Sequence, residues 1–273
     1  MTSKRHEKTK KAVAAALLAL SVCLTAACSD EAESRVIVAG STSVQPYVEL
    51  MAEEFAMQHP GSSIDVQGGG SSAGITAAET GAAELGMSSR ALKEDEQQQL
   101  WSVEIAKDGL AVIVNPKNSV TNLTLEQVRG IYSADIKDWS ELGGAAAKIH
   151  IIAREEGSGT RSAFEDLVMG ESFRITPKAI VQNSNGAVRQ IVAGDPDSIG
   201  FISLGLADQT VKIVKLGGVM ASRENVVNGS YSLYRPFLFV AKAKPDGLAM
   251  QFVDFVLSPE GKKLMADEGL IPE

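Results

Sequence analysis

Short apolar segments alternate with longer amphipathic ones along almost the whole chain from Arg35 onwards. Residues 36–39 and 110–114 have the length and composition of buried strands, whereas residues 44–58 repeat their apolar side chains at the spacing of one helix face. Strands that alternate with helices in this way form α/β folds, in which most neighbouring strands run parallel. The pattern therefore predicts mainly parallel sheets flanked by helices.

The individual elements can be placed along the sequence from this alternation. The expected strands are residues 36–39, 63–66, 84–87, 110–114, 148–153, 179–181, 199–202, 211–214 and 236–241. The expected helices are residues 44–58, 72–80, 92–100, 125–131, 160–169, 185–193, 247–257 and 259–267. Asn115-Pro116 follows the fourth strand, and the composition allows the chain to cross between two domains there.

The first residues are expected to be an export signal rather than part of the fold. Five of residues 4–11 are Lys or Arg, and residues 12–27 form an apolar run that ends in small residues, which is typical of a signal peptide. Thr25-Ala26-Ala27-Cys28 resembles a bacterial lipobox. We therefore expect removal of residues 1–27, lipidation of Cys28 and a tether over residues 28–34. A plain signal peptide without lipidation is the alternative.

The charge of the chain excludes one class of partner. The 273 residues carry a net charge of −8, and residues 1–27 contain five basic residues and one acidic residue, so the remainder holds 21 basic and 33 acidic residues, a net charge of −12. Nucleic-acid binding needs a basic face that contacts phosphates. No nucleic-acid partner is expected, whereas a small anion can still be bound by neutral dipoles inside a cleft.

Four segments share one design: the end of a strand, a turn of glycine and polar residues, and the start of a helix. A helix start offers free backbone N–H groups and the positive end of the helix dipole, glycine lets an anion approach the backbone, and hydroxyls add donors without charge. A capped helix looks the same, so one such turn is weak evidence, but the repetition indicates an oxyanion site. The turns are Gly40-Ser41-Thr42-Ser43, Gly68-Gly69-Gly70-Ser71-Ser72, Gly157-Ser158-Gly159-Thr160 and Asn183-Ser184-Asn185-Gly186.

Two arginines lie next to the third of these turns. Arg154 ends an apolar strand three residues before Gly157, where its guanidinium can make a bidentate contact to a tetrahedral oxyanion. The alternative is an ion pair with Glu155 or Glu156. Arg161 lies in the first turn of a helix, where a cation opposes the helix dipole unless an anion is near.

An enzyme built on the same turns is the competing hypothesis. Gly70-Ser71-Ser72-Ala73-Gly74 fits the nucleophile elbow of serine hydrolases, which also needs a downstream histidine. Only His150 follows, inside an apolar strand. With three histidines, and no cysteine after Cys28, neither a transition-metal site nor another cofactor is expected.

Several motifs, taken in order, resemble the phosphate-binding proteins of bacterial high-affinity phosphate ABC transporters. The similarity extends over nearly the whole chain from Val36 to the C-terminus. The motifs are Val38-Ala39-Gly40-Ser41-Thr42-Ser43-Val44-Gln45-Pro46, Val66-Gln67-Gly68-Gly69-Gly70-Ser71-Ser72-Ala73-Gly74-Ile75, Gly86-Met87-Ser88-Ser89-Arg90, Arg154-Glu155-Glu156-Gly157-Ser158-Gly159-Thr160-Arg161 and Val181-Gln182-Asn183-Ser184-Asn185-Gly186-Ala187.

The resemblance implies a hinged, two-domain periplasmic-binding-protein-like fold of type II. The first α/β domain would comprise residues 35–112 plus 232–273, and the second residues 113–231. It also implies a binding protein and not an enzyme: an exported, membrane-anchored lipoprotein facing the periplasm or the cell exterior, which captures inorganic phosphate and delivers it to ABC transporter permease subunits. Sulfate, molybdate or another oxyanion is the alternative ligand.

The family's ligand positions can be transferred by motif to this sequence. The residues carried over as phosphate ligands are Thr42, Ser43, Ser71, Ser72, Arg154, Ser158, Gly159 and Thr160, with Ser89 at the end of the third strand. Four residues near the turns are additional candidates: Arg90, Glu156, Arg161 and Asn183.

Ser89 is where this chain departs from one branch of that family. That branch has an aspartate there, which accepts the proton of phosphate and would repel sulfate. Ser89 can both donate and accept, so the resemblance leaves the selectivity mechanism open. Glu156 is the candidate replacement acceptor, and an ion pair with Arg154 or Arg161 is its alternative role.

Overall fold

The computed structural model describes residues 34–272, and the residues from Arg35 onwards form one compact unit. The expected export signal, Cys28 and all but the last residue of the expected tether lie outside the described residues. None of the helices in the part of the chain that is described is long and apolar enough to cross a membrane.

The main sheet is mixed rather than uniformly parallel. Its hydrogen-bonded order is β2-β1-β3-β11-β4-β8-β6-β7, with β9 and β12 also paired to β4. Two of its strands, β4 and β11, pair antiparallel with each other. The main-sheet strands are β1 (Ser34–Gly40), β2 (Ser62–Gly68), β3 (Leu85–Ser88), β4 (Trp101–Val114), β6 (His150–Arg154), β7 (Ile180–Gln182), β8 (Ser198–Ser203), β9 (Lys212–Ile213), β11 (Tyr234–Ala241) and β12 (Ile271–Pro272).

Parallel pairing is found on both sides of this antiparallel centre. On one side β1 runs parallel to β3, and on the other β6 runs parallel to β7 and β8. Strand β4 also pairs antiparallel with β8, and β11 with β3. A separate two-stranded sheet joins β5 (Asn122–Leu123) to β10 (Lys215–Leu216).

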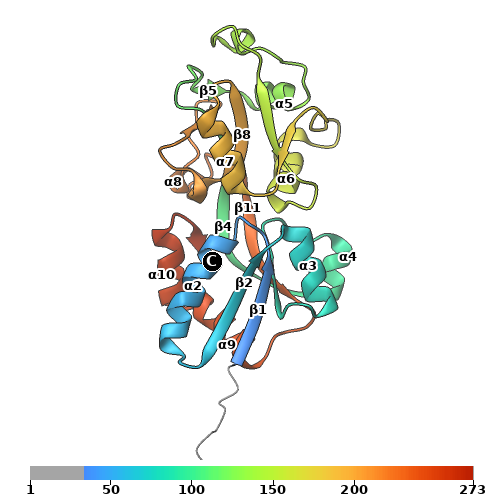
Figure 1. The fold of residues 1–273 in the computed structure, drawn as a ribbon, viewed down its shortest axis with the longest axis vertical. Coiled ribbons are helices and arrows are strands. Elements are labelled where there is room, and N and C mark those ends of the chain that lie inside the picture. Colours follow the sequence, from blue (N-terminus) through green and yellow to red (C-terminus); the bar gives the residue numbers. More distant parts are fainter. Residues whose placement is uncertain (1–33, 273) are drawn as a thin grey trace, which may run out of the picture. The chain divides into compact units, whose positions relative to one another are not determined.

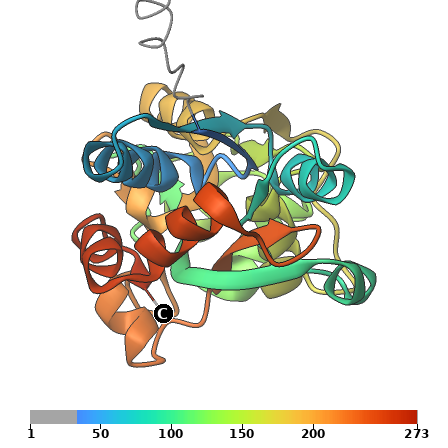
Figure 2. The same cartoon turned by 90° about the horizontal axis from the view of Figure 1, so that it is seen from below.

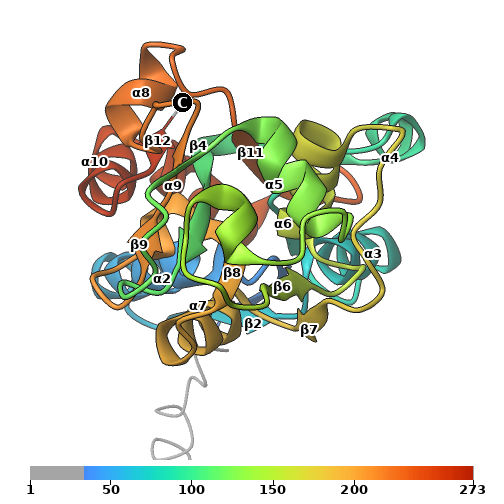
Figure 3. The same ribbon diagram turned by 90° about the horizontal axis from the view of Figure 1, so that it is seen from above.

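Helices follow most strands and cover the sheet. In the structure α2, α9 and α10 pack against one another (Figures 1 and 2), whereas α7 packs on β6 and β8 (Figure 3). The helices are α2 (Gln45–Gln58), α3 (Ser71–Thr80), α4 (Glu94–Gln99), α5 (Leu125–Tyr132), α6 (Gly159–Phe164), α7 (Asn185–Gly194), α8 (Arg223–Val227), α9 (Gly247–Leu257) and α10 (Pro259–Asp267).

The expected strands and helices are all present, with two informative differences. The strand expected at residues 110–114 begins at Trp101 in the structure. Its first half was not predicted because charged residues conceal the strand pattern there, although this half pairs with β11. The helix expected at residues 160–169 is α6 followed by a π-helical turn, Glu165–Met169.

The buried apolar side chains form two large clusters and a small one. One large cluster draws its buried members from residues 110–233, and the other from residues 36–106 and 237–270. Strand β4 contributes Ile105 and Ala106 to the second and residues 110–114 to the first. The long strands β4 and β11 therefore connect the elements built around these cores (Figure 1).

Candidate functional site

Hydroxyl groups from three of the four predicted turns meet in the interior. Ser43 Oγ, just before α2, lies 2.8 Å from Thr160 Oγ1 in the first turn of α6. Ser41 Oγ donates to Ser89 Oγ at 2.8 Å, and Ser71 Oγ lies 3.3 Å from the same atom. We call Ser41, Ser43, Ser71, Ser89 and Thr160 the hydroxyl cluster; each is at most 2% exposed.

Two glycines let the turns approach this closely. A Cβ on Gly159 would lie 2.2 Å from Ser71 Oγ and 2.6 Å from Ser89 Oγ. Gly70 has a φ of +89°, in the region that favours glycine, and a Cβ there would lie 3.0 Å from the carbonyl oxygen of Gly157. The neighbouring Ser72 N–H donates to that carbonyl at 3.2 Å. Glycine is thus needed here for close contact between turns that are far apart in the sequence.

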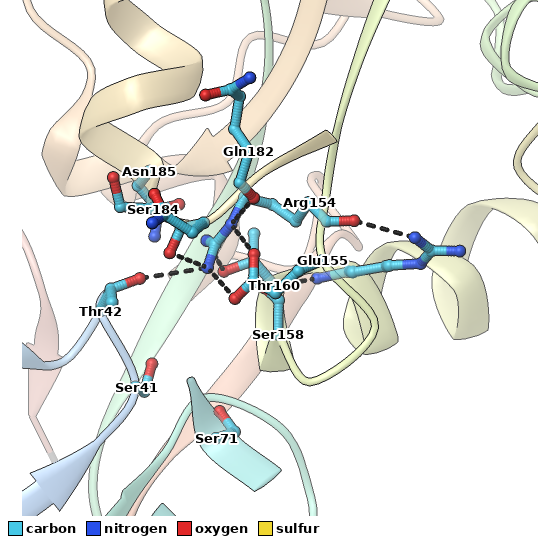
Figure 4. Close-up of polar contacts among 12 residues, drawn as sticks. Ser41, Thr42, Ser71, Arg154, Glu155, Ser158, Thr160, Gln182, Ser184 and Asn185 are labelled. Carbon is cyan, nitrogen blue, oxygen red and sulfur yellow. Dashed lines mark hydrogen bonds and ion pairs between the residues drawn. The ribbon is translucent and has the colours of Figure 1, made fainter. Parts of the chain in front are cut away.

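Arg154 extends from the end of β6 to the edge of this cluster. Its side chain, 1% exposed, points toward Thr42 and donates from Nη2 to Thr42 Oγ1 at 3.2 Å (Figure 4). Nη1 lies 3.4 Å from Thr160 Oγ1. Glu155 accepts two hydrogen bonds from the guanidinium, both at 2.8 Å. The predicted arginine is therefore buried, fixed by its neighbour in sequence and directed at predicted ligand residues.

Arg161 contacts the backbone of Arg154 and not the hydroxyl cluster. Its Nη1 donates to the backbone carbonyl of Arg154 at 2.9 Å, and its Nε donates to Glu165 at 2.9 Å. Glu165 supplies the negative charge that we expected from a bound anion. Arg161 is accordingly placed as a brace for Arg154 rather than among the hydroxyls.

A second buried arginine, Arg235 on β11, was missed by the sequence analysis. Its Nε and Nη2 donate to Asp108 Oδ2 on β4 at 3.1 and 2.9 Å. Nη2 also donates to Ser43 Oγ at 3.0 Å, and Nη1 lies 3.4 Å from Ser89 Oγ. The only local signal was a charged residue at the start of an apolar strand; contact with the cluster depends on long-range strand pairing.

Asn185 is another missed residue, although it belongs to a predicted turn. Its Nδ2 donates to Ser43 Oγ at 2.9 Å, and its Oδ1 accepts from the backbone N–H of Ser203 at 3.2 Å. The Ser203 hydroxyl in turn donates to Asp108 Oδ1 at 2.8 Å. Asn183, the residue chosen from this turn, is exposed, and its backbone carbonyl accepts a weak contact from Arg154 at 3.4 Å.

Three other candidates lie outside the hydroxyl cluster. The Ser72 side chain is exposed, while the adjacent Ser71 is buried. Arg90 forms a forked pair with Glu96, with two contacts of 2.7 Å. Glu156 is exposed, and the structure does not support its expected pairings, because Arg154 pairs with Glu155 and Arg161 with Glu165.

Two of the turn hydroxyls serve as helix caps. Ser158 Oγ accepts from the backbone N–H of Arg161 at the start of α6, and Ser184 Oγ accepts from Ala187 at the start of α7. For these two residues the alternative of a capped helix is the observed role. The backbone N–H groups of the first turn of α6, including those of Gly159 and Thr160, remain suited to an anion.

The electrostatics of the site are dominated by two buried guanidinium groups. Burial lowers the pKa of Arg235, an effect that the neighbouring Asp108 carboxylate opposes and the nearby charge of Arg154 reinforces. Arginine stays protonated in proteins because its ordinary pKa is so high. Two positive charges thus lie close together at a group of neutral donors, an arrangement suited to a small anion.

Other chemistry is not favoured by the same residues. Among residues 34–272 no group of three or more His, Cys, Asp or Glu side chains is placed to hold a metal ion. His150, required by the hydrolase hypothesis, pairs with Asp195 at 2.7 Å. It starts β6, about 13 Å along the strand from Arg154 at the other end, and so lies far from the turns.

Comparison with known proteins identifies related chains. A family model described as a PBP superfamily domain matches residues 25–260. The phosphate-binding protein PstS of Bacillus subtilis is 30% identical over 97% of this chain and 95% of its own. A substrate-binding protein of Clostridium perfringens, solved with bound phosphate, is 43% identical with a TM-score of 0.85, covering 88% of this chain and all of the other. An ABC-type phosphate transport receptor from Vibrio cholerae is 39% identical with a TM-score of 0.73, covering 87% and 100%.

Proposed function

Because the chain belongs to the PstS family of phosphate-binding proteins, within the PBP superfamily, we propose that it binds inorganic phosphate and supplies it to an ABC transporter. The proposed ligand residues are Arg154, Thr42, and the hydroxyl cluster, together with the backbone N–H groups that begin α6. The relatives are substrate-binding proteins, and this chain is a binding protein and not an enzyme.

One observation carries the proposal: the buried Arg154 guanidinium lies among hydroxyl groups supplied by separate turns. Charge-assisted hydrogen bonds from a guanidinium are stronger than neutral ones and match the geometry of a tetrahedral oxyanion. Hydroxyls donate further hydrogen bonds without adding charge that would have to be buried. Glu155 holds the guanidinium from one side and leaves its Nη1 and Nη2 atoms facing Thr160 and Thr42.

Calorimetry with a panel of anions tests the proposal directly. The exported, mature chain would be titrated with phosphate, arsenate, sulfate and molybdate. We expect phosphate and its isostere arsenate to bind. Tighter binding of sulfate or molybdate than of phosphate would establish the alternative of another oxyanion, and binding of none of them would contradict the proposal.

We also propose that residues 35–112 plus 232–273 and residues 113–231 are two domains that close on the ligand. The separate apolar clusters support a division close to this one, with residues 110–112 and 233 packed in the core of the second part, and β4 and β11 would connect the two. The contacts from Thr42 to Arg154 and from Ser43 to Thr160 join the two parts. Small-angle scattering with and without phosphate should then show a smaller radius of gyration in the bound protein.

The anchor and the permease partner belong to the same proposal. The Thr25-Ala26-Ala27-Cys28 sequence supports lipidation of Cys28, and the family is extracytoplasmic, as export by residues 1–27 requires. Mass spectrometry of the mature N-terminus should find a diacylglyceryl Cys28. An unmodified terminus at another position would leave a plain exported protein. Co-purification with transporter permease subunits from native membranes tests the partner.

A further inference from the structure

Arg235 and Asp108 form a buried ion pair that the proposed phosphate ligands do not include. Both side chains are 2% exposed, and they are contributed by β11 and β4, 127 residues apart in sequence. Phe237 covers the guanidinium, whose central carbon lies 5.5 Å from the ring centroid. A buried ion pair adds little net stability, because the loss of hydration offsets the attraction between the charges. Stability alone therefore does not explain why the pair is there.

The contacts of Arg235 point toward the site. The edge of the guanidinium formed by Nη1 and Nη2 faces Ser89 and Ser43 of the hydroxyl cluster, and Nη2 and Nε both donate to Asp108. The Nη1 contact to Ser89 is 3.4 Å, longer than an ordinary hydrogen bond. The N–H groups on this edge thus point at the cluster, and Nη1 has no hydrogen bond of ordinary length to it.

The two guanidinium groups lie on either side of one pair of hydroxyls. Arg154 Nη1 lies 3.4 Å from Thr160 Oγ1, Thr160 Oγ1 lies 2.8 Å from Ser43 Oγ, and Arg235 Nη2 donates to Ser43 Oγ at 3.0 Å. Like charges this close repel each other at low dielectric. A divalent anion between them would turn that repulsion into attraction for both.

We propose that Arg235, held in place by Asp108, is a second guanidinium anchor for the bound oxyanion, acting across the Ser43–Thr160 hydroxyl pair from Arg154. The inference rests on the proposed phosphate-binding function. Both Asp108 oxygens are occupied, one by Ser203 and the other by Arg235, so this carboxylate is a counterion and not a proton acceptor for the ligand.

The proposal changes how the Ser89 position is understood. One branch of the family has a carboxylate there, whereas here the Ser89 hydroxyl contacts a cation. In this chain the position thus carries a neutral hydroxyl beside a positive charge. The site is thereby suited to divalent tetrahedral oxyanions, with hydroxyl groups that can accept a ligand proton or donate to an unprotonated oxygen.

Calorimetry of variants of the exported, mature protein with inorganic phosphate tests the assignment. The double variant Asp108→Asn/Arg235→Gln removes the pair without leaving one buried charge alone, and thermal melts report its folding. We expect a roughly ten- to hundredfold loss of phosphate affinity, the scale of a charge-assisted hydrogen bond. The control Arg189→Gln/Asp208→Asn removes an arginine–aspartate pair with a 3.1 Å contact between α7 and the segment after β8; the pair does not touch the hydroxyl cluster, so the variant should bind like wild type.

A second variant separates an anchor from a purely structural role. Arg235→Lys keeps the charge but cannot reproduce the forked contact to Asp108. An anchor predicts phosphate affinity within about tenfold of wild type and clearly above that of the double variant. Equal affinity of Arg235→Lys and the double variant would overturn the proposal, as would a folded double variant that binds within about twofold of wild type. If wild type itself fails to bind phosphate, the proposed function is at fault instead.

Discussion

Arg154 and Arg235 are both buried and contact different members of the hydroxyl cluster, but the chain holds them in opposite ways. Arg154 ends a short parallel strand and is fixed by Glu155, the next residue in sequence. Arg235 lies on an antiparallel strand and is fixed by Asp108, from a strand that precedes it by 127 residues. One half of the site is thus built locally, by strand-to-helix turns, and the other by pairing between distant strands.

The two halves of the site should respond differently to substitution. The local half is held by helix caps, a neighbouring carboxylate and the brace from Arg161 to the Arg154 carbonyl. The long-range half depends on the register of β4 against β11, where Asp108 lies opposite Arg235. A change within a turn should therefore alter binding more than stability, whereas a change at the strand pair should alter both.

Arg154→Ala tests the local half with the largest expected effect. Removal of one partner of a buried, charge-assisted interaction typically costs about 2–5 kcal/mol. We expect phosphate affinity to fall by that amount, with the fold retained. Calorimetry measures the loss, and circular dichroism is the folding control. An affinity within about twofold of wild type would remove Arg154 from the site and leave Arg235 as its main cation.

Gly159→Ala tests the contact between turns. The added methyl would meet Ser71 Oγ at 2.2 Å and Ser89 Oγ at 2.6 Å, so α6 must move away from α3. We expect phosphate binding to weaken by about 1–3 kcal/mol, the usual cost of overpacking. Gly194→Ala is the control, because a Cβ at Gly194, the last residue of α7, meets no other atom within 4 Å. Equal affinities of the two variants would show that the turns need not approach this closely.

Two neighbouring glutamates differ in whether they contact Arg154. Both carboxylate oxygens of Glu155 accept hydrogen bonds from Arg154, whereas Glu156 is exposed. Glu155→Gln should weaken the binding of all oxyanions by about 1–2 kcal/mol, because the amide keeps only one oxygen that can accept from Arg154. Glu156→Gln should bind phosphate and sulfate like wild type. A rise of sulfate relative to phosphate in Glu156→Gln would instead identify Glu156 as the acceptor for the ligand proton.

The smallest expected effect concerns Arg90, the sequence candidate that pairs away from the hydroxyl cluster. The hydrogen bond from Arg90 lowers the pKa of Glu96. A lowered pKa means that the pair stabilises the fold above the pKa of the unfolded chain and that this contribution disappears as the pH falls through the folded value. Glu96→Gln should therefore cost about 1 kcal/mol of unfolding free energy at neutral pH and almost nothing in acid.

Denaturant titrations of Glu96→Gln and wild type at both pH values measure this difference. Phosphate affinity should be unchanged, because the Arg90 guanidinium contacts Glu96 and the Ala91 carbonyl and not the hydroxyl cluster. Weaker phosphate binding in this variant would return Arg90 to the ligand site.

Much of the fold and the local half of the site could be predicted from the sequence. Strand and helix positions follow from hydrophobic periodicity, which is set by neighbouring residues. Arg154, Ser43, Ser71, Ser89 and Thr160 were identified because each belongs to a contiguous motif at a strand end. The N-terminal half of β4 was missed because Glu104, Lys107 and Asp108 interrupt its apolar pattern.

Which of the polar groups meet depends on tertiary packing rather than on any local sequence pattern. Ser71 and not Ser72 faces the cluster, because one residue of helical rotation moves a side chain by roughly 100°. Asn185 lies in the first turn of α7 and contacts Ser43, whereas Asn183 precedes that helix and is exposed. Glu156 lies in the turn between β6 and α6, where it is exposed. Asp108 and Arg235 come together because β4 and β11 pair in one register. Periodicity is a local property of the sequence, and it determined where the strands and helices lie. Contact between distant strands is set by packing of the whole chain, and it determined the position of the second arginine, Arg235, beside the hydroxyl cluster.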